Sequence, residues 1–226
     1  MEMIDTRYGT FRGLVRLALT RAELALGDGG VSLPDPTAIR RLVFVCHGNI
    51  CRSAFADVLA RKHGLNTASF GLSTANDKPA HPPVTAAAAA MGHDLGAHRS
   101  LRVQDYTPAE GDLLLAMETR HLRKLAGDPA LAAIPRTLLG LYTRPATPHL
   151  HDPYELSDAY TRACLKRIAT AIPVLAAAFP GAVSAAFSPP SPFVLSEVEG
   201  RARSKAPEAR ASTGSARTDQ TGSESA

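Results

Sequence analysis

The chain has 226 residues, of which 45% are apolar and 20% charged, with 17 Gly, 17 Pro and no Trp. This length and composition are typical of one globular domain with additional segments. Lys and Arg exceed Asp and Glu by only 25 to 21, and no basic run or aromatic-basic stripe predicts nucleic-acid binding. A membrane-spanning helix needs roughly 20 consecutive apolar residues, and no stretch is long enough and free of charge. Charges also interrupt the first apolar stretch, which argues against a signal peptide, so we expect a cytoplasmic protein.

The first 38 residues are expected to form an amphipathic helix followed by a linker. Apolar residues recur at spacings of three and four between residues 8 and 26, which predicts a helix that ends at Gly27. The Pro-containing stretch that follows is typical of a linker. We expect the helix to pack against its own domain or to be poorly ordered. Contact of this helix with a membrane surface is the alternative, which we do not favour here.

Residues 39–180 alternate short apolar stretches with helical ones. The pattern predicts strands at 42–46, 67–71, 112–117 and 137–141, and helices at 53–63, 83–91, 119–126 and 156–179. Strands separated by helices pair in parallel through right-handed crossovers. We therefore expect an α/β three-layer sandwich with a four-stranded parallel sheet and helices on both faces. Ligands of such sheets bind at the carboxyl ends of the strands, so the loop after the first strand is the first place to look for a site.

The composition changes beyond residue 180. Ser, Ala, Pro, Gly and Thr dominate, mixed with Glu and Arg, and no periodicity could bury a face. We expect residues 181–226 to form a disordered tail.

The loop between the first strand and the next helix reads Cys46-His47-Gly48-Asn49-Ile50-Cys51-Arg52-Ser53. A helix N-terminus presents unpaired backbone N–H groups and a partial positive charge, so a loop wrapped around one point there can hold a phosphate-like dianion. Gly48 and Asn49 are residue types that tolerate the left-handed backbone angles of such a wrap.

Cys46 and Arg52 bring a thiol and a guanidinium to this loop. An anion-binding loop and a nearby arginine favour the thiolate form, so Cys46 is the candidate nucleophile. Arg52 supplies a planar fork that can hold two oxygens of a phosphoryl group. The Ser53 hydroxyl can bond the sulfur and favour its departure as thiolate, and the set predicts phosphoryl transfer to sulfur. The alternative is that Cys46 is a structural cysteine at a strand end. The other residues of the loop would then stand at these positions by chance.

The segment from Val45 to Ser53 resembles the active-site loop of the low-molecular-weight protein tyrosine phosphatases. The resemblance covers about 140 residues, from Arg41 to near Pro180, and includes the strings at 92–95, 97–100, 112–117 and 151–154. It implies a phosphatase without a metal or organic cofactor. It also implies that the substrate is bound by His47, Gly48, Asn49, Ile50, Cys51, Ser53 and Tyr154.

The resemblance implies that Asp152 is the general acid and later the general base. Taken alone, the Asp152-Pro153 pair is a turn opener before a helix. The resemblance further implies a hydrogen-bond network beneath the loop, carried by Asn49, Ser53, Ser69 and His98.

Cys51 could form a reversible disulfide with Cys46 that protects the nucleophile from over-oxidation. The alternative is that Cys51 is only a small buried residue.

These features predict a cytoplasmic, bacterial enzyme that hydrolyses phosphotyrosine on a protein, with a bacterial tyrosine kinase as a candidate partner. Three alternatives remain. An arsenate reductase of the same fold needs further cysteines, and only Cys164 is available downstream. A phosphoarginine phosphatase resembles this pattern with Thr in place of Ile50. A catalytically silent phosphate-binding module would have no need of Cys46, Arg52 and Asp152.

Overall fold

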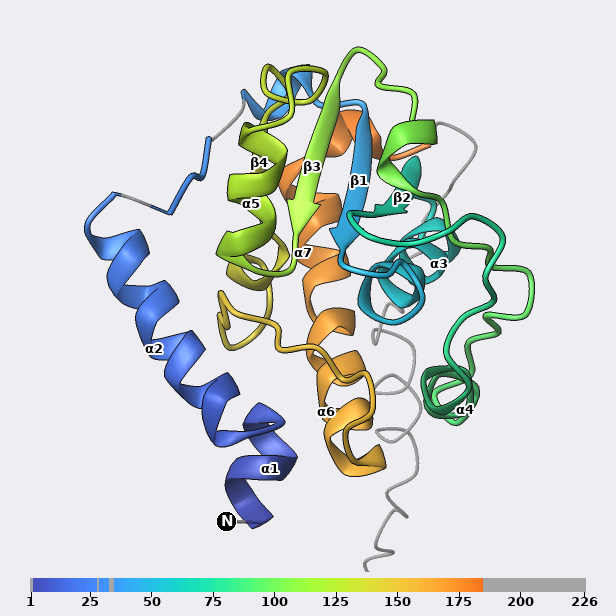
Figure 1. The fold of residues 1–226 in the computed structure, drawn as a ribbon. Helices are drawn as coiled ribbons and strands as arrows, with labels where there is room; N and C mark the ends of the chain where they lie inside the picture. The colour runs from blue at the N-terminus through green and yellow to red at the C-terminus, as the bar shows by residue number, and fades with distance from the viewer. Residues whose placement is uncertain (1, 28, 33–34, 185–226) are drawn as a thin grey trace, which may run out of the picture. The chain divides into compact units, whose positions relative to one another are not determined.

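A parallel β-sheet forms the centre of the computed structural model, which describes residues 2–27, 29–32 and 35–184 (Figure 1). The strands of the described residues are β1 (Arg41–Cys46), β2 (Thr67–Gly71), β3 (Asp112–Ala116) and β4 (Arg136–Leu138). They form one four-stranded sheet in the order β2-β1-β3-β4, and each neighbouring pair is parallel. The predicted four-stranded parallel sheet is confirmed.

Helices cover both faces of this sheet. The longer helices after β1 are α3 (Arg52–Lys62), α4 (Pro82–Ala89), α5 (Thr119–Ala126), α6 (Asp158–Ala169) and α7 (Ala171–Ala178). Successive side chains of a strand point to opposite faces. Phe44 of β1 therefore packs in one apolar cluster with α3, α6 and α7, whereas Val45 packs in a second cluster with α5. The predicted three-layer α/β sandwich is confirmed.

The last helix differs from the prediction of one helix over 156–179. The structure has two helices, α6 and α7, which meet at Thr170. Pro173 explains the break, because it has no N–H to donate to the Ala169 carbonyl and its ring crowds that carbonyl. Ser157 caps the start of α6 with its side chain, so the helix begins two residues later than predicted.

The fourth strand is shorter than the predicted 137–141. It ends at Leu138, and Leu139–Leu141 forms a 3₁₀ turn. The Thr147 backbone approaches Gly140 so closely that a Cβ on Gly140 would lie 1.9 Å from the Thr147 carbonyl oxygen, and Thr147 N donates to Gly140 O at 2.8 Å. At Gly140 the chain therefore turns away from the sheet and pairs with the segment at Thr147, which leads on to Asp152.

Within the described part of the chain, two α-helices precede the sheet where the sequence predicts one over 8–26. They are α1 (Glu2–Tyr8) and α2 (Phe11–Ala25). Gly9, with φ of 80°, separates them, and Thr10 caps α2 by accepting a hydrogen bond from Gly13 N at 3.0 Å. Gly13 and Leu17 are buried, and α1 lies against α6, so this segment packs on the sandwich. No helix of the described residues is long and apolar enough to cross a bilayer.

The first residues of the predicted tail belong to the folded domain. Ala182 O accepts a hydrogen bond from Asn66 N, and Ser184 N donates to Gly64 O, both at 2.8 Å. These bonds hold residues 181–184 beside the start of β2. The remainder of that prediction, residues 185–226, lies outside the described residues.

Candidate active site

The loop between β1 and α3 wraps at the carboxyl edge of the sheet. β1 ends at Cys46 and α3 begins at Arg52. Of the two residues predicted to take left-handed angles, Asn49 does so, with φ of 51°, whereas Gly48 does not. Gly71 of β2 supports the loop from behind, because a Cβ there would lie 3.0 Å from the backbone of both Gly48 and Asn49. The sequence pattern around Gly71 did not predict this contact with the loop.

The Cys46 thiol is held by two polar neighbours. Its Sγ accepts a hydrogen bond from Asn49 N at 3.2 Å and lies 3.0 Å from Ser53 Oγ. These contacts fix the position of the sulfur between the loop and the start of α3.

A buried polar network lies beneath the loop. Asn49 Nδ2 donates to Ser53 Oγ at 2.8 Å and to Ser69 Oγ at 3.1 Å, and its Oδ1 accepts from Leu101 N at 2.9 Å. His98 Nε2 lies 2.7 Å from Asn49 O, and burial lowers the pKa of His98. The structure thus brings together the four residues that were expected to support the loop.

Asp57 of α3 extends this network and was not foreseen. Its carboxylate accepts hydrogen bonds from Ser69 Oγ at 2.9 Å and from Thr67 Oγ1 at 2.6 Å, and pairs with Arg61 at 2.7 Å. Asp57 thereby fixes β2 against α3 and orients the Ser69 hydroxyl that faces Asn49.

Arg52 is fully buried and is held by two carboxylates. Its Nη1 donates to Glu118 Oε1 and to Leu150 O, both at 2.7 Å, and its Nη2 donates to Asp152 Oδ2 at 2.5 Å. Among the described residues its Nε has no hydrogen-bond partner. A buried donor without a partner is costly, so Nε is the atom of this guanidinium that an anion would satisfy.

Glu118 was missed by the sequence analysis. It follows β3 and is 3% exposed, so it lies at the same edge of the sheet as the Cys46 loop. Burial alone would raise its pKa, but the charge of Arg52, helped by Arg120, holds it well below its usual range. Its place directly after a buried parallel strand was the only available signal.

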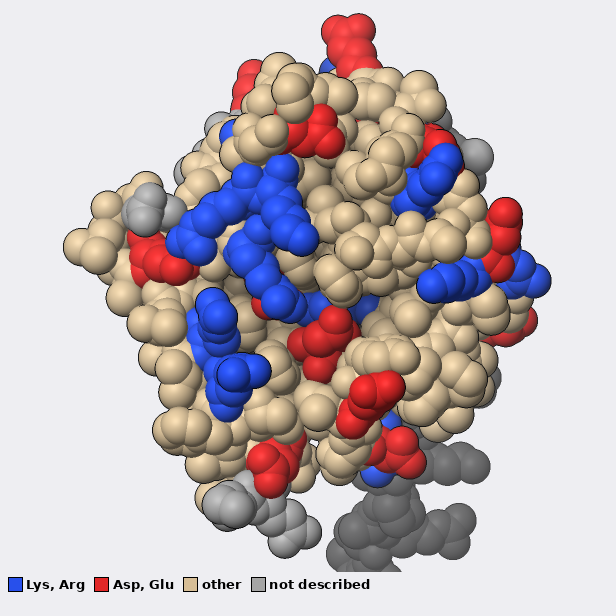
Figure 2. All heavy atoms as spheres, viewed as in Figure 1, with Lys and Arg blue, Asp and Glu red and all other residues tan. Residues whose placement is uncertain are grey.

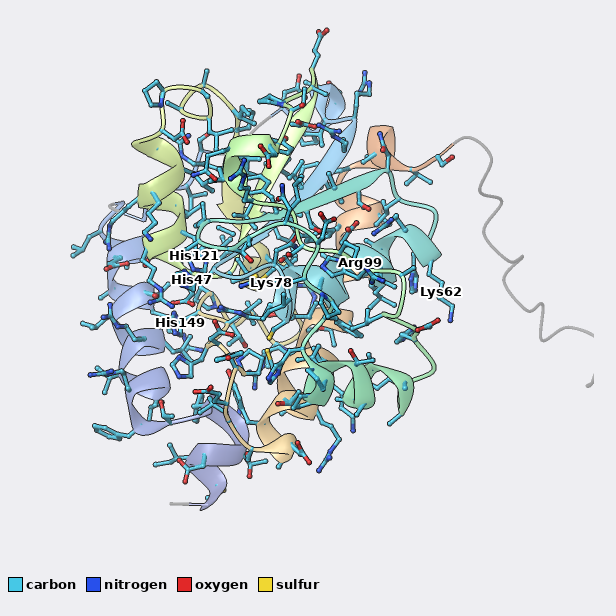
Figure 3. The ribbon with its side chains drawn as sticks, turned by 45° about the vertical axis from the view of Figure 1, so that its right-hand side comes forward. His47, Lys62, Lys78, Arg99, His121 and His149 are labelled. Atoms are coloured by element: carbon cyan, nitrogen blue, oxygen red, sulfur yellow. The ribbon has the colours of Figure 1, made fainter. Side chains whose placement is uncertain are left out.

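Two buried histidines stand beside Glu118. His121 Nε2 lies 3.8 Å and His149 Nδ1 3.9 Å from its carboxylate oxygens. Burial, with the nearby charge of Arg52, lowers the pKa of His121 to about 3, and burial lowers the pKa of His149 to about 4. Figure 3 shows both on the side of the molecule where α2 lies. Among the described residues, no group of three His, Cys, Asp or Glu side chains is placed to hold a metal ion.

A cavity of about 190 Å³ opens at this edge, which is far more than a single water molecule needs. It is lined by Cys46, His47, Gly48, Ile50, Cys51, Ser73, Thr74, Lys78, Asp152 and Tyr154. Ser73, Thr74 and Lys78 were not predicted. Asn49, Arg52 and Ser53 were also predicted to contact the substrate, but they are fully buried and are not among the residues that line the cavity.

The Asp152 loop forms one wall of the cavity. The Asp152 side chain is 28% exposed, and its Oδ1 accepts a hydrogen bond from Tyr154 N at 3.3 Å. Tyr154 is 48% exposed and packs against His81, with ring centroids 4.8 Å apart and the ring planes tilted by 45°. An aromatic ring exposed beside a cavity can stack on a phenyl ring of a ligand.

All three cysteines are free thiols. Burial raises the pKa of Cys51 above its usual range, and burial raises the pKa of Cys164 to about 11. Cys164 is fully buried in α6, so it is closed to partners from solution.

Comparison with known families places residues 41–184 under the family model "Low molecular weight phosphotyrosine protein phosphatase". The low molecular weight protein-tyrosine-phosphatase Wzb of Salmonella typhi is 39% identical over 89 residues, which make up 38% of this chain and 58% of that protein. The matched part spans 57 to 58% of the length of Wzb and of the probable phosphatase EpsP of Ralstonia nicotianae.

Solved structures share the fold over a longer stretch. The tyrosine phosphatase Wzb from Escherichia coli K30, solved with sulphate, is 25% identical with a TM-score of 0.52 and matches over 60% of this chain and 94% of that one. The YwlE arginine phosphatase from Geobacillus stearothermophilus is 24% identical with a TM-score of 0.52, over 61% of this chain and 91% of that one. At this identity the likeness to YwlE is one of fold.

Proposed function

This chain belongs to the low molecular weight phosphotyrosine protein phosphatase family, and from that premise we propose that it hydrolyses phosphotyrosine in proteins through a phosphocysteine on Cys46. The observation that carries the proposal is that Cys46, hydrogen-bonded by Asn49 N, lines the same cavity as Asp152. A nucleophile and a proton donor in one cavity are the two groups that the reaction needs.

In the first half-reaction, Cys46 Sγ attacks phosphorus and the bond to the phenolic oxygen breaks. Asp152 gives its proton to the departing phenolate. The loop amides and Arg52 hold the phosphoryl oxygens. Arg52 Nε, which has no hydrogen-bond partner within the described part of the chain, supports this assignment.

In the second half-reaction, water attacks the phosphocysteine and gives its proton to Asp152. Inorganic phosphate forms and the sulfur leaves as thiolate. The Ser53 hydroxyl, 3.0 Å from Sγ, stabilises that leaving group. Asn49, Ser69 and His98 keep the loop in the binding conformation, and Tyr154 with His47 and Ile50 borders the phenyl ring.

Redox control of the nucleophile is part of the proposal. Peroxide oxidises the Cys46 thiolate to a sulfenic acid, and the Cys51 thiol then displaces water to form a disulfide. Because burial raises the pKa of Cys51, its thiol must lose its proton as it attacks the sulfenic acid. Mass spectrometry after peroxide treatment should find the 46–51 disulfide, and Cys51→Ser should lose activity irreversibly. An equally reversible Cys51→Ser variant would remove Cys51 from this role.

The source and setting are also proposed. The named relatives come from bacteria, which supports a bacterial protein, and we assign it to the cytoplasm with a bacterial tyrosine kinase as its phosphoprotein partner. The phosphatase domain is proposed to start at residue 39, with α1 and α2 as an added N-terminal segment. The family match from residue 41 to 184 supports this division.

The test is one protein assayed against para-nitrophenyl phosphate, a phosphotyrosine peptide, phosphoarginine and arsenate with thioredoxin. Hydrolysis of the phosphotyrosine peptide is expected, with a ³²P label on the protein after acid quenching that Cys46→Ser abolishes. Asp152→Asn should slow poor leaving groups most. Preference for phosphoarginine, arsenate reduction without phosphatase activity, or phosphate binding without turnover would each overturn the proposal in favour of a named alternative.

A further inference from the structure

The outer face of the N-terminal helices is unusually apolar. Among the described residues, six large apolar side chains are exposed, and five of them lie within the first 26 residues. On α2, Phe11, Val15 and Leu19 follow one another at steps of four, so they form one row along the helix. Phe11 is 69% and Leu19 51% exposed, whereas Leu17 on the opposite face is buried. The helix is therefore fixed by one face and presents the other to solvent.

Arginines border this apolar row. Arg12 and Arg16 each follow a residue of the row by one position, and Arg21 lies further along the same helix; all three are exposed. The acidic residue of α2, Glu23, is paired with Arg123 of α5 at 2.8 Å. Figure 2 shows Lys and Arg side chains gathered over α2 and α5. The outer face of α2 thus carries an apolar row with positively charged side chains beside it.

An anionic lipid surface fits this face. A helix lying in a bilayer interface buries an apolar row at the acyl boundary while flanking arginines reach lipid phosphates. We propose that α2 docks this protein on a membrane surface rich in anionic lipid, with Phe11 and Leu19 inserted and Arg12 and Arg16 on the headgroups. A second copy is a poorer occupant, because a two-fold pairing of this face would bring the same arginines together.

Vesicle flotation of the full-length protein tests the proposal. Binding is expected with phosphatidylcholine vesicles that contain phosphatidylglycerol, should fall as salt is added, and should be weak with phosphatidylcholine alone. Phe11→Ser with Leu19→Ser should weaken binding more than tenfold. Arg12→Gln with Arg16→Gln should weaken it roughly 25-fold, at about fivefold for each arginine.

A matched control removes two charges elsewhere. Lys62 and Arg99 are exposed, and Figure 3 shows them on the opposite side of the molecule from His121 and His149, which lie toward α2. Lys62→Gln with Arg99→Gln should leave vesicle binding unchanged. All of these variants should hydrolyse para-nitrophenyl phosphate like the parent, which separates docking from the proposed activity.

Three results would overturn the proposal. The parent protein could fail to float with anionic vesicles. The α2 variants could bind as tightly as the parent, which would place the contact elsewhere in the chain. Light scattering could find a dimer that Phe11→Ser with Leu19→Ser dissociates, which would make this face a contact between two copies.

Discussion

Thr10 and His151 are joined by a hydrogen bond of 3.2 Å between Thr10 Oγ1 and His151 Nε2, although 141 residues separate them. The approach is close, because a Cβ on Gly9 would lie 2.9 Å, and one on Gly13 3.0 Å, from the His151 ring. On its other side, the His151 carbonyl accepts a hydrogen bond from Tyr160 OH at 3.0 Å. The N-terminal helices and α6 therefore hold the residue that precedes Asp152.

Thr10→Val removes the hydroxyl from this contact. We expect kcat to fall about threefold to tenfold with poor leaving groups and little with good ones, because only the former depend on a well-placed proton donor. Steady-state rates over a series of aryl phosphates measure this. Thr10→Ser keeps the hydroxyl and the helix cap and should behave like the parent. An equal loss across the series would show that the contact does not act through Asp152.

Glu118→Gln removes the charge that faces Arg52. The buried guanidinium loses one of its two carboxylate partners, and breaking a buried ion pair from one side costs about 3 kcal/mol or more of unfolding free energy. Urea unfolding at neutral pH measures the loss. Glu110→Gln, at an exposed position, removes the same charge and should cost less than about 0.5 kcal/mol. Equal stability of the two variants would mean that Asp152 alone compensates Arg52.

Asn49 combines a left-handed backbone with side-chain bonds to Ser53 and Ser69. Asn49→Ala should lose both and cost about 2 to 4 kcal/mol, whereas Asn49→Gly relieves the backbone and should recover about 1 kcal/mol of that. Chemical unfolding of the pair separates the two effects. Glycine and alanine variants of the same stability would contradict a backbone contribution.

The buried histidines predict loss of stability in acid. The pKa values of His121, about 3, and His149, about 4, lie below the roughly 6.5 of the unfolded chain. The unfolded state therefore binds more protons between these values, so stability is complete above about pH 6.5 and falls as the pH falls. At about pH 5 each histidine should cost roughly 2 kcal/mol.

Unfolding near pH 7.5 and near pH 5 checks this difference. His121→Phe should reduce the difference by roughly 2 kcal/mol, while His63→Gln, at an exposed position, should leave it unchanged. A His121→Phe variant with the full acid loss would exclude His121 as its source.

Two kinds of feature could be predicted from the sequence: those carried by neighbouring residues, and those that the family resemblance implies. The Cys46 loop is one continuous string between a strand and a helix, and the network of Asn49, Ser53, Ser69 and His98 forms as that resemblance implies. Glu118 escaped prediction because its partner Arg52 lies 66 residues away and a lone glutamate carries no spacing signal. The break of the last helix at Thr170 could have been predicted, because Pro173 lies inside the predicted helix and a proline interrupts the hydrogen bonding of a helix.

The ion pair between Arg52 Nη2 and Asp152 Oδ2 has a consequence for the order of events in turnover. A phosphate ester that enters the cavity would compete with the Asp152 carboxylate for the same guanidinium. By taking that guanidinium, the ester would free the Asp152 side chain to turn toward the leaving group. An uncharged phenol could not displace the carboxylate and would leave the ion pair closed.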